Sequence, residues 1–104
     1  MIRIQYKRGK YCPVFVCDQC GKPITDHASG IEVAPIQAAE GELLACYHVH
    51  QGTCDEAMER RLGAVCGWED LGVHVARLLH NTKINGKVLR DSLHRAQLLD
   101  SITL

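Results

Sequence analysis

The chain has 104 residues, 46% of them hydrophobic, and its formal net charge at neutral pH is zero. This length fits a small folded unit, and the composition is that of a folded chain rather than a disordered one. A neutral balance gives no general argument for nucleic-acid binding, and no apolar run reaches the roughly 18 residues of a membrane span. Residues 1–16 hold four cations and no long apolar run, which is unlike a secretory signal. We therefore expect a cytoplasmic protein whose thiols stay reduced.

The first half of the chain has the pattern of β-strands. Residues 2–7 alternate between apolar and polar, residues 8–10 indicate a turn, and β-type composition resumes after them. This pattern predicts a hairpin over residues 2–16 with a half-buried first strand. Further strands are predicted over residues 31–37 and 43–49.

Helices are predicted in the second half. Thr53 has the pattern of a capping box, because its hydroxyl can accept from the Glu56 amide while the Glu56 carboxylate reaches back. Gly63 is a natural end for this short helix. Apolar residues at helical spacing predict two more helices, near 69–80 and about 87–101. The short link between them predicts an antiparallel pair.

Four residues have the spacing of a zinc site: Cys17 and Cys20, then His50 and Cys54. Zinc prefers four nitrogen or sulfur ligands in a tetrahedron, and a tight turn brings two cysteines that are two residues apart to the same side of the chain. The positive end of the helix dipole favours the Cys54 thiolate. The sequence therefore predicts one structural Zn²⁺ bound by Cys17, Cys20, His50 and Cys54.

The identity of the histidine ligand is open at this stage. Cys46, His48 and His50 alternate, so all three can lie on one face of a strand. His48 is the main alternative to His50, and Cys46 is expected to be a small buried hydrophobe. A metal-free set of reduced cysteines, a disulfide, or a redox pair of Cys17 and Cys20 also remains open.

A turn with two cysteines, a β-hairpin, and ligands in the first turn of a helix resembles a treble-clef zinc finger. The resemblance covers about residues 12–63 and implies a structural zinc. The ligand order is also similar to the first half of a LIM domain. No second quartet of cysteine and histidine follows, so LIM function is not implied.

The remaining cysteines and histidines have ordinary interpretations. Cys12 lies on a predicted strand, where packing explains it, and Cys66 lies in a predicted linker, where it is expected to fill the core. His27 follows the two-cysteine turn and is expected to be exposed. Surface or boundary positions are expected for the three histidines on predicted helices: His74, His80 and His94.

Four protein ligands leave no open position for substrate, which argues against an enzyme. The first functional hypothesis is a protein-interaction module, with possible self-association through apolar residues of the C-terminal helices. The alternative is nucleic-acid binding by a basic hairpin with two tyrosines beside its turn, although residues 17–70 hold three cations against ten acids. Thiol redox or zinc-dependent catalysis is a weaker alternative.

The predicted fold is α+β. A zinc-binding, β-rich module with a short helix spans residues 1–65, and a C-terminal helical pair that packs on it spans residues 66–104.

Overall fold

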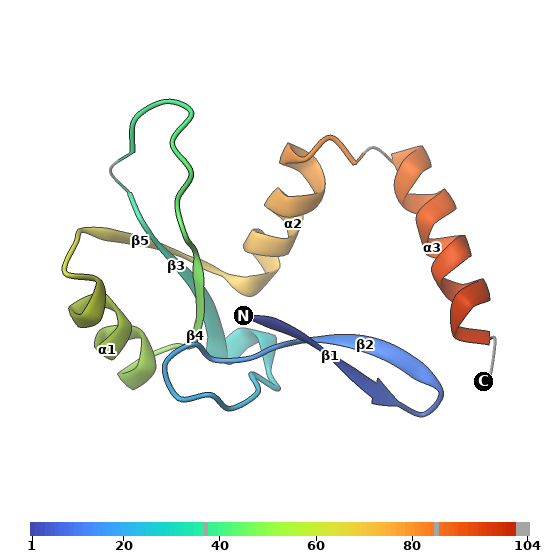
Figure 1. Ribbon diagram of the computed structural model, residues 1–104, viewed down its shortest axis with the longest axis horizontal. Helices are drawn as coiled ribbons and strands as arrows, with labels where there is room; N and C mark the ends of the chain where they lie inside the picture. Colours follow the sequence, from blue (N-terminus) through green and yellow to red (C-terminus); the bar gives the residue numbers. More distant parts are fainter. Residues whose placement is uncertain (37, 85, 102–104) are drawn as a thin grey trace.

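The computed structural model describes residues 1–36, 38–84 and 86–101. These residues form two small antiparallel sheets and three α-helices (Figure 1), which confirms the predicted α+β class. Gln37, at the end of a predicted strand, lies outside the described residues. Within them, no helix has both the length and the apolar character that crossing a bilayer requires.

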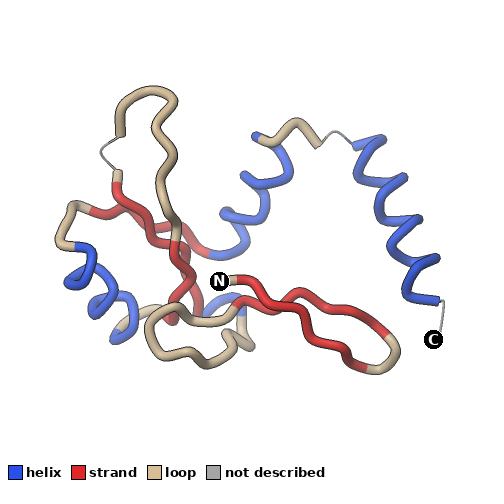
Figure 2. The backbone as a smooth tube through the Cα atoms, in the orientation of Figure 1, coloured by secondary structure: helices blue, strands red, loops and turns tan. Residues whose placement is uncertain are grey.

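The first sheet is the predicted N-terminal hairpin of β1 (Ile2–Lys7) and β2 (Lys10–Phe15). Its turn residues, Arg8 and Gly9, both have positive φ, 52° and 78°. Such a two-residue turn matches the twist of a hairpin. The half-buried strand predicted here is wrong, since all six residues of β1 are exposed. Figure 2 shows why: the hairpin extends away from the second sheet.

The second sheet has three strands, with β3 (Gly30–Pro35) between β4 (Tyr47–His50) and β5 (Cys66–Asp70). β4 is shorter than predicted, because residues 43–46 lie outside it. β5 replaces the linker expected at Cys66, and that expectation is wrong. The sequence does not predict β5, because Gly67, Glu69 and Asp70 are residue types that are uncommon in strands. Even so, β5 pairs with β3 over five positions.

The core lies mainly between this sheet and α1 (Thr53–Leu62). Ile31, Val33 and Val49 share one face of the sheet by strand alternation. Each is at most 2% exposed and clusters with Met58 of α1. Cys66 packs against the edge of this cluster, as the sequence predicted.

The helix starts differ from the sequence prediction. Gly52 is the N-cap of α1 and Thr53 is already inside the helix, with the Glu56 amide donating to the Gly52 carbonyl at 2.9 Å. The capping box predicted at Thr53 is therefore wrong. The predicted end is confirmed, since Gly63 caps α1 with a left-handed φ of 61°.

The two C-terminal helices are present, but the antiparallel pair predicted for them is not found among the described residues. α2 (Leu71–Asn81) begins at the Asp70 cap, and α3 (Gly86–Ser101) follows after a short link. None of the residues described for α3 is buried, and Figure 1 shows α3 standing apart from α2. The apolar side chains of α3 are 40–66% exposed: Val88, Leu89, Leu93, Leu98 and Leu99. The predicted antiparallel packing is thus not found in the described chain.

Candidate metal centre

Four side chains from three parts of the fold meet at one point. The ligand atoms of Cys17, Cys20, His50 and Cys54 all lie within 4.8 Å of one another. The first two come from the turn after β2, His50 ends β4, and Cys54 lies in the first turn of α1. Three sulfurs and one imidazole nitrogen are a donor set that suits Zn²⁺. This group could hold a metal ion.

The two-cysteine turn is fixed by its own backbone. The Cys17 amide donates to the Lys22 carbonyl at 2.9 Å, and the Gly21 amide donates to the Cys17 carbonyl at 2.9 Å. Gly21 has a φ of +76°, a conformation that favours glycine. The Cys20 amide lies 3.4 Å from Cys17 Sγ and donates to it. The turn therefore presents both sulfurs to the same point.

His50 is oriented by its second ring nitrogen. Nε2 lies 3.3 Å from the Pro23 carbonyl oxygen, which can only accept, so Nε2 carries the proton and Nδ1 keeps its lone pair. Nδ1 lies 3.5 Å from Cys20 Sγ. Standard zinc–ligand lengths in a tetrahedron place such atoms about 3.6 Å apart. A backbone carbonyl behind a ligating histidine is the usual way of fixing its orientation.

The Cys17 and Cys54 thiols of this group have pKa values shifted in opposite directions. Burial raises the pKa of Cys17, but the backbone amides of Cys20, His50 and Gln19 outweigh it and lower this pKa to about 6. Burial and the neighbouring Cys17 and Cys20 sulfurs raise the pKa of Cys54 to about 11. Crowded sulfurs cannot all ionise together without a compensating charge, which a divalent cation supplies.

A second group of possible ligands lies on the same sheet. Ligand atoms of Cys46, His48 and His74 lie within 4.8 Å of one another, so His48, the alternative to His50, faces a different cluster. The surface position expected for His74 is wrong, because its exposed fraction is 8%. The buried position expected for Cys46 is also wrong, because Cys46 is exposed. His27 is exposed, as expected.

Burial controls the charge of the two facing histidines. It lowers the pKa of His48 to about 4, helped by repulsion from the N-terminal amine and from His74. Burial also lowers the pKa of His74, although Glu69 acts in the opposite direction. Both rings are therefore neutral near pH 7.

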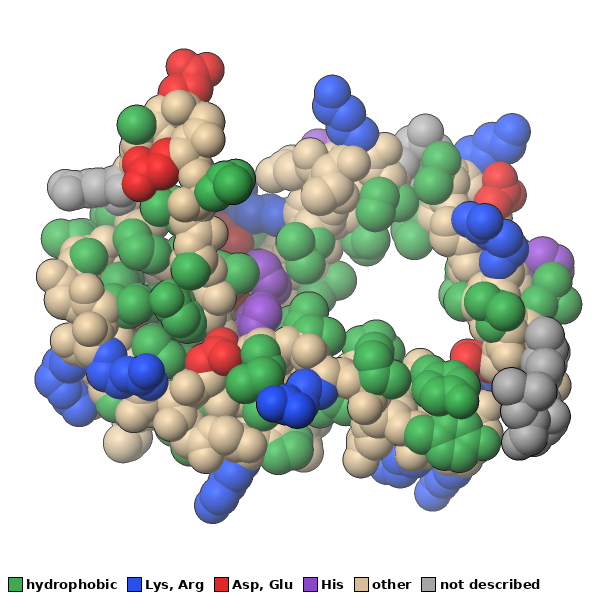
Figure 3. All heavy atoms as spheres, viewed as in Figure 1, with side chains coloured by type: hydrophobic (Ala, Val, Ile, Leu, Met, Phe, Trp, Pro, Cys, Tyr) green, Lys and Arg blue, Asp and Glu red, His purple; other side chains and the backbone are tan. Residues whose placement is uncertain are grey.

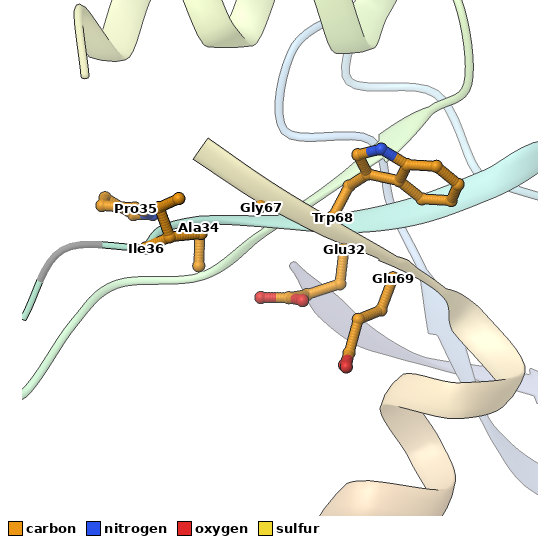
Figure 4. Close-up of a pocket in the computed structure, with 7 residues that line it drawn as sticks. All are labelled: Glu32, Ala34, Pro35, Ile36, Gly67, Trp68 and Glu69. Atoms are coloured by element: carbon orange, nitrogen blue, oxygen red, sulfur yellow. The ribbon is translucent and has the colours of Figure 1, made fainter. Parts of the chain in front are cut away.

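Two carboxylates adjoin these histidines. Glu32 and Glu69 are paired across β3 and β5, and they form a third possible ligand group with His74. Figure 4 shows both carboxylates on one side of the sheet and the Trp68 ring on the other. Arg77 forms an ion pair with Glu69. Burial, and then the Glu69 charge, raise the pKa of Glu32.

Sequence reasoning missed His74, Glu32 and Glu69 as members of a cluster. The alternation of Cys46, His48 and His50 was the available signal, since it places three donors on one strand face. The partners of this row are Glu32 of β3, Glu69 of β5 and His74 of α2, and nothing local in the sequence predicts that β5 pairs with β3 or that α2 lies against β4.

In comparisons with known proteins, no protein-family model matched the chain, and neither did any curated protein or solved structure.

Proposed function

We propose that this protein is a small zinc-binding protein in which one structural Zn²⁺ is held by Cys17, Cys20, His50 and Cys54. The convergence of these four ligand atoms within 4.8 Å carries the proposal. Their positions in a two-cysteine turn, at a strand end and in a first helical turn support a treble-clef-like module. Four protein ligands close the coordination sphere, so the role proposed for this ion is folding rather than catalysis.

The zinc is expected to contribute directly to folding, because it joins the two-cysteine turn, β4 and α1. Apparent binding energies of structural zinc are on the order of 10–16 kcal/mol, comparable to or larger than the stability of a small domain. A module of this size without its metal is therefore expected to unfold.

Native mass spectrometry of protein purified without added metal tests this proposal. Cys54→Ser should lose a zinc ion that the wild type holds, and circular dichroism should show unfolding of the N-terminal half. Cys12→Ser is the matched control, since Cys12 lies outside the cluster, and it should keep both zinc and fold. A Cys54→Ser variant with the zinc content and unfolding temperature of the wild type would reject the proposal.

We further propose that the zinc module supports binding to an apolar surface of another protein. The exposed leucines of α3 and the exposed Ile4, Tyr6 and Tyr11 of the hairpin support this role. Figure 3 shows hydrophobic side chains gathered over these two elements. Contiguous exposed apolar surface of this kind usually marks an interaction site.

A substitution on α3 tests the interaction role. Leu93→Glu should abolish capture of a partner that the wild type enriches from cell extract, while Asp91→Asn on the same helix should not. Analytical ultracentrifugation of the purified protein separates self-association from binding to a different protein. Identical partner sets for wild type and Leu93→Glu would contradict this role.

Nucleic-acid binding is a second candidate, supported by one feature of the hairpin. The Tyr6 and Tyr11 rings lie 5.0 Å apart and are about 60% exposed, beside Lys7, Arg8 and Lys10. Exposed aromatic rings and cations together suit single strands. Fluorescence anisotropy with single-stranded RNA should then show salt-dependent binding that a triple alanine variant of the three cations loses. Absence of binding at low salt would remove this candidate.

A further inference from the structure

A second set of metal-ligand side chains occupies the same strand face as His50. Cys46 directly precedes β4, His48 lies within it, and α2 crosses over so that His74 lies against both. Alternate residues of a strand are about 7 Å apart, so this set is separate from the cluster at His50. One strand thus carries donors for two neighbouring groups.

The distance between the two imidazoles fits a shared ion. His48 Nε2 lies 3.1 Å from His74 Nε2. Two imidazole nitrogens bound to one tetrahedral zinc would lie about 3.4 Å apart. A hydrogen bond between neutral rings has a similar length, but it would leave Cys46 Sγ unused. The thiol within 4.8 Å of both nitrogens makes the group a ligand set.

The buried His48 ring has lost its hydration and requires a strong polar partner in its place. Its exposed fraction is 5%, and its Nδ1 is buried with no hydrogen-bond partner among the residues that the structure describes. The Phe15 ring, with its centroid 4.8 Å away, covers one side of the imidazole. A buried polar ring is costly unless it is compensated. A metal bond at Nε2 would compensate the ring at that atom and would leave Nδ1 unchanged.

The carboxylates of Glu32 and Glu69, next to this group, have too little positive charge around them to balance both of their negative charges. Glu32 is 9% exposed and lies between His48 on β4 and Glu69 on β5 in the register of the sheet. Like charges directly opposite on neighbouring strands destabilise a sheet. Arg77, which pairs with Glu69, is one cation for two carboxylates. A divalent cation beside Glu32 would balance the remaining charge.

We propose that Cys46, His48 and His74 bind a second Zn²⁺, with the Glu32 carboxylate beside the site rather than in the ligand set. One thiolate and two imidazoles are ligands that zinc accepts, whereas magnesium and calcium prefer oxygen ligands alone. This ion would join α2 to β4 and so hold α2 on the sheet.

Native mass spectrometry with zinc titrated into the full chain tests the second site. The wild type is expected to bind two zinc ions, whereas Cys46→Ser and His74→Gln bind one. His80→Gln, on the same helix but exposed, is the control and should bind two. Glu32→Gln should lower the affinity of the second ion at least tenfold. Hydrogen exchange in α2 should slow on zinc addition in the wild type and not in Cys46→Ser.

The stoichiometries separate this proposal from the first zinc site. One zinc in the wild type that persists in Cys46→Ser and His74→Gln overturns the second site and leaves the first in place. One zinc that both variants lose supports the second site and overturns the first. Two zinc ions in every variant, or none in the wild type, would also reject the proposal. Cys46 is exposed, so loss of folding is not expected for Cys46→Ser, and circular dichroism checks this.

Discussion

His48 shows at the residue scale how a buried titratable group couples folding to pH. Its pKa lies near 4, below the ordinary value of 6.5, so the unfolded chain binds a proton between these values that the folded chain does not. Stability from this source is complete above about pH 6.5 and is lost as the pH falls towards 4. His74 acts in the same direction, whereas the raised pKa of Glu32 acts in the opposite one, because acid neutralises a buried charge there.

We therefore predict that, with no ion bound at Cys46, His48 and His74, the unfolding free energy falls between pH 6.5 and pH 4, and that His48→Gln removes part of this fall. The shift of the His48 pKa sets an upper bound of about 3 kcal/mol for that part. Urea unfolding at several pH values measures it. His94→Gln, on α3 and remote from the cluster, should keep the wild-type pH dependence. If the unfolding free energy changes equally with pH in the wild type and in His48→Gln, then His48 does not control the pH dependence of stability.

At Gly30 the absence of a side chain allows the close packing of the core. A Cβ at Gly30 would lie 2.6 Å from Ile24 Cγ2 and 2.7 Å from Leu71 Cδ1, both in the core. Gly30→Ala is therefore expected to lower the unfolding free energy by about 1–3 kcal/mol through overpacking. Gly86→Ala is the matched control, because its Cβ would meet only the flexible end of Arg90. A thermal-melt series that finds both variants equally stable would contradict the close packing at Gly30.

At the scale of single elements, local chemistry was predictable and long-range pairing was not. The four side chains of the first cluster were correctly grouped, because Cys17 and Cys20 share one turn and the other two flank one strand-to-helix junction. β5 and the burial of His74 were missed for the same reason: both depend on contacts with β3 and β4 far away in the sequence. Strand pairing of that kind leaves no local pattern when the strand contains glycine and two acids.

Substitutions at the starts of α1 and α2 can test the helix caps, because the sequence predicted a cap at Thr53 and the structure has one at Asp70. Asp70 caps α2, since its Oδ1 accepts from the Val73 amide at 2.8 Å, whereas Thr53 lies inside α1. Asp70→Ala should cost about 1 kcal/mol, the usual value of a lost cap, and Thr53→Ala should cost much less. Chemical denaturation of the two variants measures this difference. A larger loss for Thr53→Ala would restore the capping box that the sequence predicted.

On the scale of the whole molecule, the chain has a packed centre and two extended arms. The second sheet, α1 and the start of α2 contain most of the core, whereas the N-terminal hairpin and α3 keep large apolar side chains exposed. Figure 1 shows these arms leaving the centre on the same side. Apolar arms without a covering layer contribute little to the stability of the centre, because stability follows the apolar area removed from water.

Removal of α3 should accordingly leave the centre intact. A chain that ends at residue 84 loses none of the buried residues that form the core, so its unfolding temperature should stay within a few degrees of the wild-type value. The truncated chain should also retain the zinc proposed at Cys17, Cys20, His50 and Cys54. Differential scanning calorimetry and metal analysis of both chains measure these quantities.

A large fall in unfolding temperature would mean that α3 packs against the centre in solution. The exposed leucines would then be core residues rather than a surface for a partner. Unchanged stability, together with loss of partner capture by the truncated chain, would instead assign the leucines to binding.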